Sequence, residues 1–303
     1  MSQLITELRP IDLSLAETKP ALIAVSPTVS IQTALNLMSH NKITSLPMYS
    51  HKNTDIVSII NLLDILLYLV QGKEIEKEQL NLQDPVESVL GLDIDRESYR
   101  MHKTDRSDRL IETLRAFASG KHRSLVVNFN DPQDKCWLLS QTDIIRHIVN
   151  HPDSVSGLLD LEKSVQDLTV LSEQQLVTAS DEETALNVYR FMANKNFSGL
   201  PVVDKQGQFI ADLCVEDLPN ANLETIDQLA LPCKEYVKKS SHHSTPSVAT
   251  PDTPLKNILD TMIQKDTHRV WILDSNNSKK VKGVITMSDI IALLCQHAQP
   301  SLF

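Results

Sequence analysis

Apolar and polar positions along this chain change period several times. In two segments the apolar residues recur at intervals of three and four: Ile31, Leu35 and Met38, then Leu255, Ile258, Leu259 and Met262. This spacing predicts amphipathic helices, because such positions share one helical face. Two β-rich runs joined by a polar turn, 270–273 (VWIL) and 281–286 (VKGVIT), follow the later helix and indicate a strand pair. Ser180 before the run DEET is a residue type that caps helices, so we expect a helix to begin there.

The same order of elements recurs four times. A short extended piece leads into a helix, two strands follow, and a second helix begins near an Asp. These Asp residues, at steps of 72 to 79 positions, are Asp64, Asp143, Asp217 and Asp289. A unit of this size has two or three strands and cannot bury both faces of its sheet alone, so we expect the repeats to pair. The sequence predicts an α+β fold of four β-α-β-β-α units.

The repeats divide the chain into two predicted modules. The four repeats are expected at about 20–70, 98–150, 165–220 and 245–296. The stretch 150–164 (NHPDSVSGLLDLEKS) separates the second repeat from the third. We therefore expect one module over 1–155 and another over 156–303.

Composition narrows the class of protein. The chain has 303 residues, of which 41% are hydrophobic and 22% charged, as in ordinary globular proteins. Its longest apolar stretch, 59–70, is interrupted by polar residues and is too short to span a bilayer. The N-terminus has no basic region followed by an apolar core, so we expect a protein of the cytoplasm or nucleus. The four cysteines lie far apart without a CxxC pair, which predicts reduced thiols and no metal site.

Charge and motifs exclude further classes. A net charge of −10 argues against broad nucleic-acid binding, which needs a basic surface. A small anionic ligand remains allowed, provided that its site gathers cations locally. No GxGxxG, GxxxxGK[ST], HExxH or GxSxG motif is present, and we find no residue set for catalysis, so we do not expect an enzyme.

Two His-Arg pairs stand before predicted strands at the same distance from an Asp. His122 precedes Asp143, and His268 precedes Asp289, by 21 residues. An Asp at a helix start can accept hydrogen bonds from both hydroxyls of a ribose, and a Ser or Thr one turn earlier can bond the sugar or phosphate. Thr286 and Ser140 occupy that earlier position.

The endings of the four repeats resemble those of CBS domains, the cystathionine-beta-synthase-type modules that pair into Bateman modules. GVITMSD has the full G-h-h-T/S-x-x-D pattern; WLLSQTD lacks only the Gly, ADLCVED has Cys214 in place of the hydroxyl, and SIINLLD has Asn61 there. The runs ITSLPMY and FSGLPVVD also match the family's strand after its first helix. The resemblance covers about residues 20–295. Among four-repeat CBS proteins, the chain is most similar to the gamma regulatory subunits of AMP-activated protein kinase.

This resemblance implies two Bateman modules in a pseudo-symmetric disc, with adenine nucleotides (AMP, ADP or ATP) in clefts that face its centre. It implies a non-catalytic sensor that signals nucleotide occupancy to a protein partner, such as a kinase or another regulated enzyme. Carried over residue by residue, the ribose candidates are Asp289, Asp143, Asp217 and Asp64. The phosphate candidates are His122, Arg123, His268 and Arg269. Thr253 stands where the family places a small polar residue near the ligand, and Thr286 and Ser140 supply the hydroxyls.

Each of these assignments has an alternative. An Asp at a helix start caps the helix with or without a ligand, and a His-Arg pair is often only surface. Their joint recurrence favours a function for the second and fourth repeats. For the whole chain, the alternatives are a scaffold that acts through protein contacts without nucleotide and a stand-alone binder of another adenosyl ligand.

Overall fold

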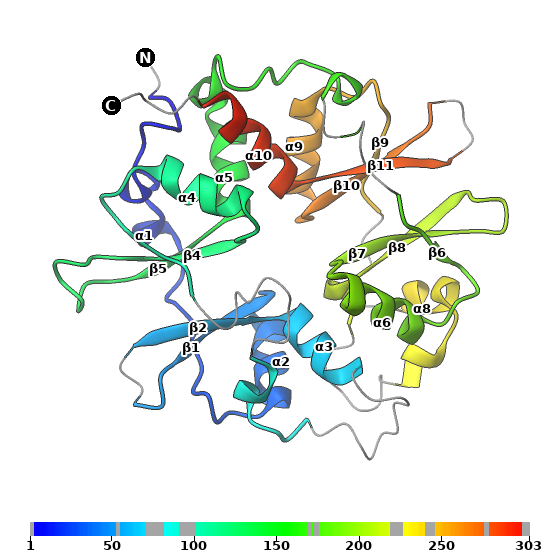
Figure 1. Ribbon diagram of the computed structural model, residues 1–303, viewed down its shortest axis with the longest axis horizontal. Coiled ribbons are helices and arrows are strands. Elements are labelled where there is room, and N and C mark those ends of the chain that lie inside the picture. Colours follow the sequence, from blue (N-terminus) through cyan, green and yellow to red (C-terminus); the bar gives the residue numbers. More distant parts are fainter. Residues whose placement is uncertain are drawn as a thin grey trace. The chain divides into compact units, whose positions relative to one another are not determined.

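The computed structural model describes residues 3–52, 55–70, 82–90, 101–168, 171, 176–218, 227–239, 246–275 and 279–298. The chain forms two compact units (Figure 1). Unit 1 comprises Met1–Leu22, His102–Leu176 and Ser247–Phe303, and unit 2 comprises Ile23–Met101 and Val177–Pro246. Unit 1 therefore holds the second and fourth repeats, and unit 2 holds the first and third. The division into modules over 1–155 and 156–303 stays a prediction.

Both repeats of unit 1 have the predicted β-α-β-β-α order. The second repeat consists of β3 (Lys103–Asp105), α4 (Leu110–Ala118), β4 (Arg123–Val127), β5 (Trp137–Ser140) and α5 (Gln141–Asn150). The fourth consists of β9 (Val248–Ala249), α9 (Leu255–Gln264), β10 (Arg269–Leu273), β11 (Val281–Thr286) and α10 (Met287–His297). In each three-stranded sheet the middle strand pairs parallel with the first strand and antiparallel with the last. The α+β class is confirmed.

The repeats of unit 2 follow the same order with shorter outer elements. The first consists of α2 (Ile31–Asn41), β1 (Ser45–Tyr49), β2 (Ile56–Asn61) and α3 (Leu62–Val70). A single parallel bridge between Val25 and Met48 replaces its first strand. The third consists of β6 (Ala179–Ser180), α6 (Ala185–Lys195), β7 (Gly199–Val203) and β8 (Phe209–Cys214).

Two details of the third repeat differ from the prediction. Asp217 ends a 3-10 turn, η6 (Val215–Asp217), where a helix was expected, and α8 (Cys233–Lys239) comes later. The N-cap of α6 is Thr184, whose side chain accepts a hydrogen bond from the N–H of Asn187 at 3.3 Å. The expectation that Ser180 caps this helix was wrong, because Ser180 is the last residue of β6 and pairs with Val203. The chain has to complete a turn before the helix can begin.

Helices of the two repeats pack against each other within each unit. In unit 1, α4 packs on α10 and α5 packs on α9, and their apolar faces form one buried cluster that includes Leu114, Phe117 and Leu294. In unit 2, α3 packs on α6, and Leu66 joins the cluster around Tyr189. Burial of these faces supplies most of the stability of such short helices.

The N-terminal segment belongs to unit 1. Ile5 and Leu8 are buried in its core. The N–H of Ile5 donates to the carbonyl of Ser154 at 2.8 Å, and the N–H of Leu110 donates to the carbonyl of Leu8 at 2.7 Å. A single helical turn, α1 (Leu15–Thr18), follows. Every helix in the described part of the chain falls short of the length and apolar character that crossing a bilayer requires.

Candidate functional site

The ends of the second and fourth repeats carry the same reciprocal hydrogen bonds. The hydroxyl of Thr286 donates to Oδ2 of Asp289 at 2.7 Å, and the N–H of Asp289 donates back to Oγ1 at 3.3 Å. Ser140 and Asp143 repeat this arrangement at 2.7 Å and 3.4 Å. These are capping boxes, which satisfy N–H groups that a helix start would otherwise leave without partners. The capping role that rivalled ribose binding is thus present in both repeats.

The first and third repeats keep the cap with other side chains. The N–H of Asp64 donates to the amide oxygen of Asn61 at 2.9 Å, and the N–H of Asn61 donates to Asp64 at 2.8 Å. In the third repeat the N–H of Cys214 donates to Asp217 at 2.9 Å. An amide oxygen therefore replaces the hydroxyl as an acceptor in the first repeat. It offers no O–H for a ligand.

The two His-Arg pairs occupy equivalent places. Arg123 lies opposite Ser140 in the strand pair, and Arg269 lies opposite Thr286. In each case the carbonyl of the preceding His accepts the N–H of the first residue of the following helix. His122 accepts from Gln141 at 3.2 Å, and His268 accepts from Met287 at 3.1 Å. The structure brings each predicted pair beside the helix start that carries its Asp.

The other two repeats have the same main-chain bond at residues that the sequence interpretation missed. The carbonyl of Thr44 accepts from Leu62 at 3.1 Å, and that of Ser198 accepts from Val215 at 3.0 Å. Thr44 and Ser198 thus take the position of the His. In all four repeats, the residue just before the strand that follows the first helix lies beside the capping residue at the end of the paired strand. This common register would have identified Thr44 and Ser198.

The four Asp side chains differ in exposure. Asp64, Asp143 and Asp217 are buried, whereas Asp289 is partly exposed. Beside them, Arg269 is buried, while Arg123 is half-buried. Of the four carboxylates, Asp289 is the one whose oxygens a ligand can reach most directly.

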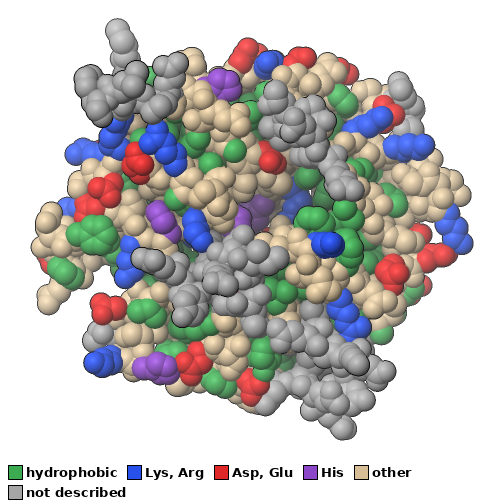
Figure 2. All heavy atoms as spheres, viewed as in Figure 1, with side chains coloured by type: hydrophobic (Ala, Val, Ile, Leu, Met, Phe, Trp, Pro, Cys, Tyr) green, Lys and Arg blue, Asp and Glu red, His purple; other side chains and the backbone are tan. Residues whose placement is uncertain are grey.

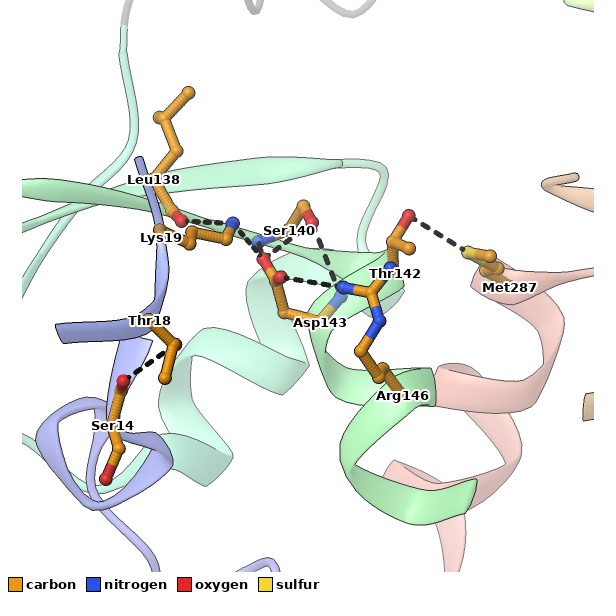
Figure 3. Close-up of polar contacts among 9 residues, drawn as sticks. All are labelled: Ser14, Thr18, Lys19, Leu138, Ser140, Thr142, Asp143, Arg146 and Met287. Atoms are coloured by element: carbon orange, nitrogen blue, oxygen red, sulfur yellow. Dashed lines mark hydrogen bonds and ion pairs between the residues drawn. The ribbon is translucent and has the colours of Figure 1, made fainter. Parts of the chain in front are cut away.

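Asp143 is held by two cations. Figure 3 shows Lys19 and Arg146 reaching the carboxylate from opposite sides. Nζ of Lys19 lies 2.6 Å from Oδ2 and also donates to the carbonyl of Leu138 at 2.8 Å. A guanidinium nitrogen of Arg146 lies 3.6 Å from Oδ1. The negative charge of this carboxylate is therefore already paired with two positively charged side chains of the same unit.

Asp289 has no such counter-ion within the described residues. Its Oδ2 accepts from the N–H and hydroxyl of Thr286 at 2.8 and 2.7 Å. Among the residues that the structure describes, Oδ1 has no hydrogen-bond partner and no Lys or Arg forms an ion pair with the carboxylate. One carboxylate oxygen thus stabilises the helix start, and the other is available to a ligand.

Thr253 lies in a turn that precedes α9. Its Oγ1 accepts from the N–H of Thr250 at 3.1 Å, and its carbonyl accepts from Val165 at 3.0 Å. No hydrogen bond joins it to Asp289 in the described part of the chain. Its place near a ligand stays a prediction.

Basic and acidic side chains are interspersed on the face drawn in Figure 2, so that face carries no broad basic patch over the described residues. The described residues also contain no cluster of three or more His, Cys, Asp or Glu side chains suited to a metal ion. Local groups such as the His-Arg pairs would have to attract an anion to a protein of net charge −10.

Comparison with known proteins agrees with the repeat structure. Residues 15–71, 165–221 and 241–295, more than half of the chain, match the family model of the CBS domain. The second repeat, at 98–150, lies outside these matches, although its strands and helices follow the order of the fourth.

Whole-chain relatives are distant. The chain is 23% identical over 291 residues to the uncharacterized protein MJ1225 of Methanocaldococcus jannaschii, covering 89% of this chain and 94% of that protein. The crystal structure of that protein, a proposed archaeal homologue of g-AMPK, has a TM-score of 0.73 at 21% identity and covers 94% and 99% of the two chains. This similarity shows the fold.

Two relatives come from Kluyveromyces lactis. The chain is 19% identical over 284 residues to the gamma subunit of 5'-AMP-activated protein kinase, covering 89% of this chain and 84% of that subunit. It is 21% identical over 338 residues to Protein SDS23, of which it spans 64% while 96% of this chain is covered.

Proposed function

Because this chain belongs to the CBS-domain family, we propose that it is a non-catalytic regulatory protein that binds an adenine nucleotide and signals occupancy to a protein partner. Its relation to a gamma subunit of 5'-AMP-activated protein kinase supports AMP, ADP or ATP as the ligand and a kinase or another regulated enzyme as the partner. The fourth repeat carries the main site. We place the protein in the cytoplasm or nucleus.

The single observation that carries this proposal is the divided use of the Asp289 carboxylate. Oδ2 accepts two hydrogen bonds from Thr286, while Oδ1 has no partner among the described residues. A ribose presents two adjacent hydroxyl donors, and hydrogen bonds to a charged acceptor are each worth about 1.5–3 kcal/mol. The carboxylate can therefore accept the ribose without giving up the cap.

The phosphate end of the ligand is assigned to the His-Arg pairs. Arg123 and Arg269 lie on the two repeats of unit 1, so each repeat has an arginine beside the helix start that bears its Asp. A guanidinium stays charged and can bind two phosphate oxygens at once, which suits it to this role. In the linkage we propose, a nucleotide held by Asp on one repeat and by His-Arg on another stabilises one arrangement of the repeats, which the partner recognises.

Isothermal titration with AMP, ADP and ATP tests the proposal. Asp289→Asn keeps an oxygen that can accept the capping bonds but removes the charge, so it should weaken binding by about 1–3 kcal/mol, or roughly 5- to 150-fold. Asp274→Asn is the matched control, because Asp274 follows β10 at the end opposite Arg269 and carries the same charge. No heat with any of the three nucleotides would contradict the proposal, as would equal affinities in the two variants.

A ligand-free scaffold is the second candidate. The burial of Asp64, Asp143 and Asp217 favours it, because their capping bonds account for these residues without any ligand. A ligand that binds only the native state must raise the melting temperature of the protein. A melting temperature that no nucleotide raises would favour the scaffold, and a rise with S-adenosylmethionine alone would indicate another adenosyl ligand.

A further inference from the structure

The second repeat has the cap and the His-Arg pair of the fourth repeat, and it adds two cations at its Asp, Arg146 and Lys19. Lys19 lies 124 positions before Asp143 and reaches it from the N-terminal segment (Figure 3). Its Nζ joins the N–H and hydroxyl of Ser140 as a third donor to Oδ2 of Asp143. The side chain of Asp143 is only 2% exposed, whereas that of Lys19 is 28% exposed.

These contacts compete with a ribose for the carboxylate of Asp143. A carboxylate oxygen has two lone pairs, and three donors already approach Oδ2. Arg146 faces Oδ1 at 3.6 Å. A ribose held at Oδ1, as proposed for Asp289, would approach the oxygen that Arg146 faces and would meet a carboxylate whose charge Lys19 already pairs. The second and fourth sites thus share a cap and differ in whether a cation of the chain itself occupies the carboxylate.

The segment that carries Lys19 is lightly attached. α1 is a single turn of four residues, none of which is fully buried, although Leu15 and Ala16 pack against the core. Ser14, just before it, has a left-handed backbone with φ of 53°, which a residue with a Cβ adopts at a cost. The chain before it is firmly anchored, because Ile5 and Leu8 lie in the core.

Local opening of a weakly packed segment costs much less than global unfolding. Residues 14–19 can therefore detach while the preceding residues stay in place. Their detachment would break the bond from Nζ of Lys135 to the carbonyl of Ala16 and both bonds of Lys19, and it would separate Leu15 from the core.

We infer that Lys19 is a built-in competitor for the second site: it closes Asp143 to ribose, and a nucleotide binds there only when residues 14–19 withdraw. This inference rests on the proposed function, since it assigns Asp143 the ribose role that Asp289 has in the fourth repeat. The chain then has one open site and one closed site in the same unit, and occupancy of the closed site changes the position of the N-terminal segment.

Titration of AMP into paired variants tests this inference. Asp289→Asn weakens the fourth site so that the second can be measured. Adding Lys19→Met should strengthen residual AMP binding at least tenfold, because Asp143 loses its competing cation. Lys19→Arg keeps a cation and should keep the site closed. Lys103→Met is the control, because Lys103 is an exposed lysine of the same repeat and its loss changes the net charge equally.

The outcomes separate the two proposals. If wild type binds AMP and Lys19→Met gains nothing over Lys103→Met in the Asp289→Asn background, Lys19 is only a structural ion pair and the inference fails while the proposed function stands. If neither wild type nor any variant binds AMP, both fail.

A second measurement covers the case in which Lys19→Met does not fold. In the Asp289→Asn protein with Lys19 intact, millimolar AMP should speed hydrogen exchange at the N–H groups of Thr18 and Lys19, which donate to Ser14 and Leu15 in the closed state. Unchanged or slower exchange at these two amides would overturn the inference.

Discussion

The side-chain amide of Gln141 meets the hydroxyl of Ser288, with Oγ 3.0 Å from Nε2 and 3.2 Å from Oε1. Gln141 is the first residue of α5 and Ser288 the second of α10. The pair therefore joins the two helix starts that carry Asp143 and Asp289. A second contact, from the hydroxyl of Thr142 to the sulfur of Met287 at 3.6 Å, lies beside it.

This pair should contribute measurably to the stability of unit 1. In a double-mutant cycle of Gln141→Leu and Ser288→Ala, we expect a coupling of about 0.5–1.5 kcal/mol in the free energy of unfolding. Urea denaturation of the four proteins measures it. Gln166→Ala is the control, since Gln166 forms an exposed bond to Asp252 at 3.0 Å and its loss should change stability by less than about 0.5 kcal/mol. Additive effects of the two substitutions would show that the pair is not coupled.

The hydroxyl of Thr286 should matter for the fold before any ligand binds. Thr286→Val keeps the shape of the side chain but removes the hydroxyl that receives the N–H of Asp289 at 3.3 Å. We expect it to lower the free energy of unfolding by about 0.5–2 kcal/mol, the usual cost of a lost N-cap. Thr286→Ser retains the hydroxyl and should stay near the wild-type value. Equal losses in the two variants would argue that packing of the methyl group, rather than capping, is responsible.

Cys233 should be unreactive in the native protein. Burial, reinforced by the nearby carboxylates of Glu183 and Asp181, raises the pKa of its thiol to about 12. Because the thiolate is the reactive form, labelling at pH near 8 should leave Cys233 unmodified until the protein unfolds. Mass spectrometry after a timed exposure to a maleimide measures it, with the partly exposed Cys136 as the internal control. Labelling of both thiols at one rate would contradict this expectation.

His147 should make the protein less stable in mild acid. Burial and the neighbouring His151, whose ring lies 4.7 Å away, lower the pKa of His147 from its ordinary value of 6.5. As the pH falls below about 6.5, His147 becomes protonated in the unfolded chain while it stays neutral in the folded chain. The free energy of unfolding therefore decreases. His147→Gln removes the group that is protonated, and with it this part of the loss of stability in mild acid.

Denaturation profiles between about pH 7 and 5 compare the two proteins, and the profile of His147→Gln should be flatter. Identical slopes would mean that His147 takes up its proton at the same pH in the folded and unfolded chains.

Much of the fold could be predicted because the relevant signals are local. The spacing of Ile258, Leu259 and Met262 indicates a helix wherever the chain folds, and α9 contains all three. The spacing of 21 residues from His268 to Asp289 also predicts a structural relationship. Two repeats with the same spacing across a pair of strands have the same strand register. For this reason the structural equivalence of the two His-Arg pairs was accessible from the sequence.

Other features of the site depend on the three-dimensional path of the chain, which short sequence motifs do not predict. Lys19 and Asp143 are joined by the path of the N-terminal segment, and one lysine among 29 basic residues gives no sign of it. Asn61 has no hydroxyl, and only the structure shows its amide oxygen performing the capping. The 3-10 turn at Asp217 likewise could not be read from a motif that elsewhere begins a helix.

In all four repeats, a main-chain hydrogen bond fixes the start of the helix or turn that carries the Asp. The carbonyls of Thr44, His122, Ser198 and His268 each hold the first N–H of the element that follows. A peptide carbonyl is present in every residue, so this bond forms with Thr, Ser or His at the position. The four helix or turn starts therefore share one main-chain bond while the residues that provide it differ in charge and size.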